Sequence, residues 1–101
     1  MSDGPVIVFA SFRPLEGKEQ AVRELLSWMV TNTRSEPGCE RYDLYRATDG
    51  ETIHLFERYT NANALEAHRA AGYFVEYRRR IVDLIEGSVD VMVLDPVDIA
   101  G

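Results

Sequence analysis

One of the two histidines stands among small apolar residues. His68 lies at helical spacing from Ala64 and Leu65 and three residues before Ala71, so we expect its ring to face the inside of the protein. An imidazole there could remove a phenolic proton, because its ordinary pKa lies near neutrality. The other interpretation is a packed histidine whose ring is satisfied by a backbone carbonyl or by Glu57.

A carboxylate alternates with apolar residues in the third predicted strand. Glu57 shares one side of this strand with Leu55 and Tyr59, and a carboxylate is costly to bury without partners. It could orient His68 or bind a substrate hydroxyl. A structural hydrogen bond to Tyr42, its expected neighbour on the next strand, is the alternative. We take His68, Glu57 and Tyr59 as the candidate catalytic residues.

Aromatic and basic side chains could bind an aromatic ligand. Tyr59 and Trp28 combine a flat apolar surface with one polar tip, and Phe74 and Tyr77 follow at helical spacing, which is also the spacing of ordinary core residues. Residues 78–80 are all arginines, and successive helix residues turn by about 100°, so one of them could reach a pocket mouth and attract an anion. A solvated helix edge paired with nearby acids is the alternative.

Hydrophobic patterning predicts the elements that position these residues. We expect strands over residues 6–12, 39–47, 52–60 and 88–94. Helices are expected from Gly17 to the turn at residues 36–38, and from Ala62, capped by Thr60 or Asn61, to Gly87 with an interruption at Gly72. The order β-α-β-β-α-β predicts an α+β, ferredoxin-like antiparallel sheet with helices on one face. We expect a single domain over residues 1–101, with its core from about residue 5 to about residue 95.

The dipeptide Asp49-Gly50 predicts a tight hairpin between the second and third strands. With these two residues in the loop, Tyr42 pairs with Glu57 and Leu44 pairs with Leu55. These side chains then share the face that meets the helices.

The opposite face of the predicted sheet is too apolar to stay in water. It carries Ile7, Phe9, Phe56 and Met92, while the single helical layer can cover only one side. We therefore expect a second copy of the chain to pack sheet to sheet, giving a homodimer.

Composition narrows the class of partner. The chain has 101 residues with 11 basic and 17 acidic side chains, a net charge of −6, which disfavours nucleic acid and anionic membranes. A single cysteine, no long apolar run and an acidic rather than basic start predict a cytoplasmic protein without disulfides, signal peptide or membrane span. The two histidines and one cysteine give no spacing typical of a metal site.

Three blocks of the sequence resemble the antibiotic biosynthesis monooxygenase (ABM) domain family. They are residues 36–46, residues 55–59, and residues 64–68 followed by Tyr73-Phe74; the spacing between the blocks is the specific feature. The resemblance covers essentially the whole chain and implies a dimeric ferredoxin-like α/β barrel. Members of this family oxidise aromatic polyketides or quinols with O2, without metal or flavin. Related members degrade haem, isomerise a small phosphorylated dione, or have no known activity.

The resemblance also implies a pocket in each subunit between helices and sheet. Its implied lining is Ala10, Leu55, Tyr59, Leu65, His68 and Arg78 or Arg79. Members that oxidise polyketides often carry an Asn and a Trp where this sequence has Leu55 and Tyr59. The Asn, Trp and axial His of the haem-degrading members correspond here to Ala10, His68 and about Arg78, so haem degradation is not expected.

The leading hypothesis is a cofactor-independent monooxygenase that oxidises a quinol or polyketide-like phenol with O2. The expected substrate-binding residues are Ala10, Trp28, Leu55, Leu65, Phe74, Tyr77 and Arg78. The expected partners are a small aromatic substrate, O2 and a second copy of the chain. An isomerase or degradative enzyme for a small reactive carbonyl compound, and a dimeric ligand-binding or stress-response domain without catalysis, are the alternatives.

Overall fold

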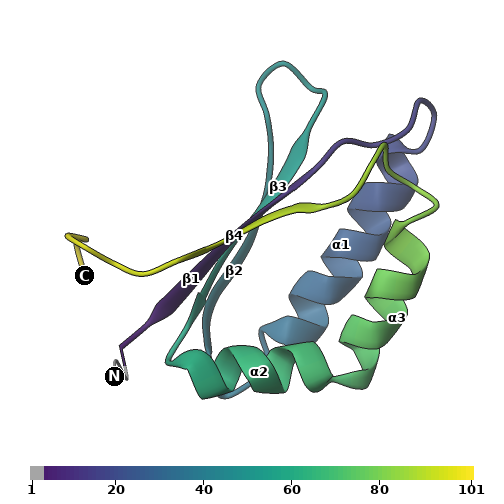
Figure 1. Cartoon of the computed structure of the whole chain (residues 1–101). Helices are drawn as coiled ribbons and strands as arrows, with labels where there is room; N and C mark the ends of the chain where they lie inside the picture. Colours follow the sequence, from purple (N-terminus) through teal and green to yellow (C-terminus); the bar gives the residue numbers. More distant parts are fainter. Residues whose placement is uncertain (1–3) are drawn as a thin grey trace.

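The computed structural model describes residues 4–101, and its elements follow the predicted order (Figure 1). They are β1 (Val6–Phe12), α1 (Glu19–Thr33), β2 (Cys39–Arg46), β3 (Ile53–Tyr59), α2 (Ala62–Ala70), α3 (Gly72–Ile81) and β4 (Asp90–Leu94). The second helical region is broken at Ala71, whose extended backbone separates α2 from α3. The side chain of Asn61 caps α2 by accepting a hydrogen bond from the backbone N–H of Ala64 at 2.9 Å.

The four strands form one antiparallel sheet in the order β2-β3-β1-β4. The predicted register of the hairpin is confirmed, because Tyr42 pairs with Glu57 and Leu44 pairs with Leu55. A shift in register between Cys39 and Arg41 marks an irregularity at the start of β2. The ferredoxin-like α+β fold is therefore the one that the sequence predicts.

All three helices lie on one side of the sheet (Figure 1). The apolar stripe of α1, formed by Val22, Leu25, Leu26 and Met29, is buried and packs toward β2 and α3. Its partners come from the inner face of the strands and from α3 and the segment after it. The buried cluster contains Ala10, Phe12, Val22, Leu25, Leu26, Met29, Tyr42, Ile53, Leu55, Tyr77, Ile81 and Ile85.

The helices leave β4 uncovered. Its four apolar residues, Val91 to Leu94, alternate between the two faces of the sheet, yet each remains between 42% and 54% exposed. Since β4 is also the edge strand beside β1, neither of its faces has a cover in the single chain. Within residues 4–101, no helix is long and apolar enough to span a membrane.

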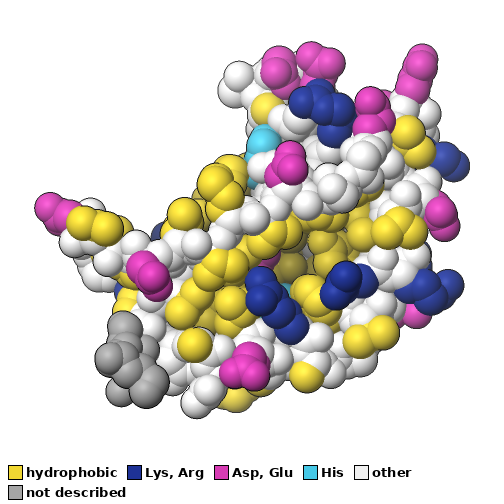
Figure 2. All heavy atoms as spheres, in the orientation of Figure 1, with side chains coloured by type: hydrophobic (Ala, Val, Ile, Leu, Met, Phe, Trp, Pro, Cys, Tyr) yellow, Lys and Arg dark blue, Asp and Glu magenta, His cyan; other side chains and the backbone are white. Residues whose placement is uncertain are grey.

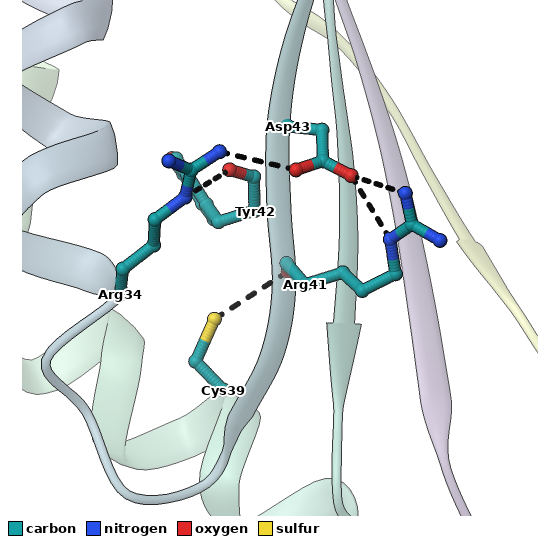
Figure 3. A network of polar contacts seen from close by, with 5 residues as sticks. All are labelled: Arg34, Cys39, Arg41, Tyr42 and Asp43. Carbon is teal, nitrogen blue, oxygen red and sulfur yellow. Dashed lines mark hydrogen bonds and ion pairs between the residues drawn. The ribbon is translucent and has the colours of Figure 1, made fainter.

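The connection between α1 and β2 is fixed by a set of polar contacts (Figure 3). Arg34, at the end of α1, donates to the backbone carbonyl of Tyr42 at 3.0 Å and contacts the carboxylate of Asp43 at 3.1 Å. The carbonyl of Gly38 accepts a hydrogen bond from the backbone N–H of Thr60 at 2.9 Å, which ties the same connection to the end of β3. Glu36 lies in this connection, so these contacts also fix its position.

A carboxylate is buried on the inner face of β3, as the alternation predicts. Glu57 is only 5% exposed, and burial raises its pKa to about 7, against an opposing hydrogen bond from Tyr59. Since its pKa is higher in the folded state, the folded state binds more protons than the unfolded state in the window from pH 4.5, the ordinary value, to about pH 7. The free energy of unfolding therefore falls as the pH rises through this window.

We expect Glu57→Gln to remove this pH dependence. Neutral glutamine keeps an acceptor for Tyr59, so the variant should gain about 3 kcal/mol of stability relative to the original protein between about pH 5 and about pH 8. Urea unfolding at the two pH values measures the change. Glu40→Gln, at an exposed residue paired with Arg58, is the control, and an equal pH dependence in all three proteins would contradict the assignment.

Candidate functional site

A cleft opens between the helical layer and the uncovered strand β4. Its volume is about 510 Å³, within the range of small-molecule sites. The walls are mostly apolar, and two arginines stand among them; the lining residues are Arg69, Phe74, Tyr77, Arg78, Ile81, Val82, Ile85, Gly87, Ser88, Val89 and Val91. Figure 2 shows this hollow framed by apolar side chains, with basic side chains beside its opening.

A smaller cavity of about 60 Å³ continues the cleft inward. The two spaces share the residues Arg69, Phe74, Tyr77 and Val91. The inner cavity adds polar side chains from the sheet and from α2; its remaining lining residues are Val8, Ala10, Tyr42, Glu57, Leu65 and His68. The cleft thus leads from an open apolar groove to a buried end that carries a histidine and a carboxylate.

The histidine at this inner end is held by a carboxylate from another element. Nδ1 of His68 lies 2.9 Å from Oε2 of Glu36, and the hydroxyl of Tyr73 donates to the same oxygen. Because an ionised carboxylate only accepts hydrogen bonds, Nδ1 carries the proton in this contact. Nε2 is then the ring nitrogen that can accept a proton, and it forms no hydrogen bond within residues 4–101.

Aromatic rings surround His68 on the other sides. Its ring centroid lies 5.0 Å from that of Phe74, 5.3 Å from that of Tyr59 and 5.7 Å from that of Tyr42. His68 is 2% exposed, and burial lowers its pKa below the ordinary value, although Glu36 opposes the shift. The ring is therefore neutral near pH 7, the state in which it can act as a base.

The partner of Glu57 differs from the expected one. The hydroxyl of Tyr59, two residues along the same strand, donates to Oε1 of Glu57 at 2.6 Å. The predicted bond to Tyr42 and the predicted contact between Glu57 and His68 are not among the hydrogen bonds of residues 4–101. The expected cross-strand bond to Tyr42 is therefore wrong, because Tyr59 reaches the carboxylate along the inner face that both side chains share.

The cleft brings together seven of the ten residues expected in the site. His68, Glu57, Ala10, Leu65, Phe74, Tyr77 and Arg78 line it. Leu55 belongs to the main buried core and Tyr59 packs with Val8 and Leu65 in a second buried cluster, and neither is among the residues that line the cleft. Trp28 lies beside the buried stripe of α1 and is not part of it. Its side chain therefore lines a separate groove with Arg79 and Arg80.

Pattern reasoning missed Glu36, Arg69 and the contact of Tyr73. The sequence places Glu36 in the turn Glu36-Pro37-Gly38, and no periodicity indicates where a turn side chain points. For Arg69 the sequence offered one signal, its position directly after His68. Two neighbouring helix residues can both line a cleft that runs along the helix, so Arg69 could have been predicted to line the same cleft as His68. Among residues 4–101, no group of three His, Cys, Asp or Glu side chains is arranged to hold a metal ion.

Comparison with known proteins matches this architecture. A protein of Mycobacterium tuberculosis with the name "Putative monooxygenase Rv0793" is 44% identical over 94 residues, which cover 93% of each chain. The solved structure of Rv0793 superposes with a TM-score of 0.94 at 43% identity and covers 97% of this chain and 100% of that one. A crystal structure from Shewanella oneidensis gives a TM-score of 0.86 at 27% identity, covering 92% of this chain and 91% of the other.

The family model described as antibiotic biosynthesis monooxygenase matches residues 5–80. This span contains the first three strands and nearly all of the helical layer, and it includes His68, Glu57 and Glu36. With a matching family model over most of its length and a 44% identical relative, this chain belongs to the antibiotic biosynthesis monooxygenase family.

Proposed function

We propose that the cleft is the active site of a monooxygenase that oxidises an electron-rich hydroxyarene, such as a quinol or polyketide-like phenol, with O2 and without a bound cofactor. Membership of the family supports an oxidising activity of this class. The observation that carries the proposal is the Glu36–His68 pair at the buried end of an apolar cleft. A base in such a place can remove a proton from a bound aromatic hydroxyl.

The first step is a proton transfer from the substrate hydroxyl to Nε2 of His68. Glu36 holds the ring by Nδ1 and stabilises the imidazolium that forms, and Tyr73 holds Glu36 in turn. The apolar walls exclude water from the resulting anion. This anion is rich enough in electrons to reduce O2 by one electron.

The substrate supplies all the electrons that O2 accepts. The substrate radical and superoxide combine at a ring carbon that bears hydrogen, and the proton on His68 converts the adduct to a hydroperoxide. The O–O bond then breaks as the ring C–H proton is lost, which leaves a carbonyl and releases water. One oxygen atom enters the product and the other leaves as water, so a hydroxyarene and O2 give a quinone and water.

Glu57 has the properties of the acid in the last step. Its pKa of about 7 keeps a protonated fraction at neutral pH, and it lines the same inner cavity as His68. A protonated Glu57 can donate to the departing hydroxide while His68 accepts the C–H proton. An isomerase acting on a small reactive carbonyl compound would use the same two groups without O2, and consumption of O2 separates the two functions.

We expect His68→Gln to lower the rate of O2 uptake with an oxidised quinol by roughly 10²- to 10⁴-fold, because glutamine cannot accept the proton. An oxygen electrode and the thermal midpoint of unfolding, measured together, separate chemistry from folding. His54→Gln is the matched control, since both ring nitrogens of His54 are bonded to Ser11 and Thr52 on the other face of the sheet. Undiminished uptake in His68→Gln would exclude His68 as the base.

We expect Glu36→Gln to move the pH profile as well as the rate. The Glu36 carboxylate raises the pKa of His68 against the effect of burial, so its removal should lower that pKa and shift the acid limb of kcat to lower pH. The rate at neutral pH should fall by roughly 10²-fold, since a less basic His68 is a weaker proton acceptor. A lower rate with an unchanged acid limb would mean that Glu36 has a purely structural role.

We also propose that two copies pack through the outer face of the sheet. This face carries Ile7, Phe9, Phe56, Met92 and Leu94. Contrary to the expectation, Ile7 is buried already in the single chain, whereas Met92 and Leu94 are 54% and 42% exposed. A sheet with an apolar face of this kind needs a cover, and the helices all lie on the other side. A second copy supplies a matching apolar face.

Met92→Glu should convert such a dimer to a monomer, because it buries a carboxylate in the apolar contact. Light scattering during size-exclusion chromatography should give twice the mass of the 11.5 kDa chain for the original protein and the mass of one chain for the variant. Val75→Glu, at an exposed residue of α3 away from the sheet, should remain dimeric. A monomeric original protein would refute the proposal.

A further inference from the structure

Two arginines line the cleft without any ion pair. Arg69 comes from α2 and Arg78 from α3, and each directly follows an inward residue, His68 or Tyr77. Both arginines are exposed, and within residues 4–101 neither forms a hydrogen bond or a salt bridge. The next residue of α3, Arg79, is instead paired with Glu76 at 2.6 Å. The two arginines of the cleft therefore keep their donors available.

The charges are unevenly distributed along the cleft. Arg78 lines only the outer groove, and Arg69 lines both the groove and the inner cavity. The acidic residues lie only toward the inner end, with Glu57 in the cavity wall and Glu36 behind His68. Figure 2 shows basic side chains beside the opening and acidic and histidine side chains within the hollow. A bound molecule with one negative end is thus favoured with that end outward and disfavoured in the reverse direction.

We propose that the substrate is a hydroxyarene with a carboxylate at the end opposite its reacting hydroxyl. The carboxylate binds to the guanidinium groups of Arg69 and Arg78, and the hydroxyl points inward to His68. This inference rests on the proposed function, since it uses the same cleft and the same base. It adds the charge of the substrate and the direction in which it binds.

The geometry of the side chains favours a carboxylate. A guanidinium presents a planar pair of donors that match two carboxylate oxygens. The apolar walls between the two ends, among them Phe74 and Tyr77, suit the aromatic body. The net charge of −6 does not cancel this local attraction, because charges beyond about 8 Å are screened at physiological salt.

The test compares two probes that differ only in the carboxylate. Binding of 6-hydroxy-2-naphthoate and of 2-naphthol to the full chain is measured by calorimetry at low and at physiological salt. We expect the naphthoate to bind at least tenfold more tightly than the naphthol. Raising the salt concentration should weaken the binding of the naphthoate only. Equal affinities, or no binding of the naphthoate, would overturn the proposal.

Variants then locate the carboxylate. Arg69→Gln and Arg78→Gln should each lower the affinity for the naphthoate by about tenfold and leave the affinity for the naphthol unchanged. Arg78→Lys should retain part of the preference for the naphthoate. Arg79→Gln, whose arginine is outside this cleft and paired with Glu76, is the matched control. An equal loss in Arg79→Gln, or no loss in either cleft variant, would also overturn the proposal.

The binding test is independent of turnover. His68→Gln should still prefer the naphthoate, since the guanidinium groups remain. If the original protein binds the naphthoate preferentially but consumes no O2 with any hydroxyarene, the monooxygenase proposal fails and the binding inference stands. If it consumes O2 only with neutral hydroxyarenes and the arginine variants do not change this, the substrate inference fails and the monooxygenase proposal stands.

Discussion

The contact between Glu36 and His68 is the interaction on which the site depends. It joins two residues 32 positions apart, one in the connection after α1 and one in α2. A neutral imidazole buried among aromatic rings has many possible orientations, and a carboxylate at Nδ1 selects one. The contact from Arg34 to Asp43 (Figure 3) and the hydrogen bond from Thr60 to Gly38 fix this connection. They therefore also position the ring of His68.

Local periodicity predicted the sheet well because its rules act over short distances. Side chains alternate with a period of two, and a loop centred on Asp49-Gly50 leaves a single register, so the pairing of Tyr42 with Glu57 followed directly. The expected two-residue loop is wrong, because the turn hydrogen bond runs from the backbone N–H of Gly50 to the carbonyl of Ala47, and Ala47 in turn bonds to Thr52. The same reasoning placed Glu57 inside the protein and His68 on the inner face of α2. It also predicted the break of the second helical region near Gly72, where Ala71 is extended.

Contacts between distant segments could not be predicted in this way. The direction in which Glu36 points depends on how the connection after α1 lies over α2, and no sequence period describes that. Glu57 bonds to Tyr59 instead of Tyr42 because side-chain reach along a strand, not register, decides between two nearby hydroxyls. Trp28 sits one helical step from the buried residues of α1, which is enough to direct it to a different groove.

Strand β4 contributes to both the cleft and the outer face through which we propose that two copies pack. Val91 on its inner face forms a wall of the cleft, whereas Met92 and Leu94 on its outer face meet no cover in the single chain. An edge strand held by one neighbour and by no packed face has little to resist bending. A partner seated on the outer face would therefore stiffen the cleft wall from behind. In the proposed dimer, the partner would act on the cleft by fixing the distance between β4 and the helices, without placing any residue in it.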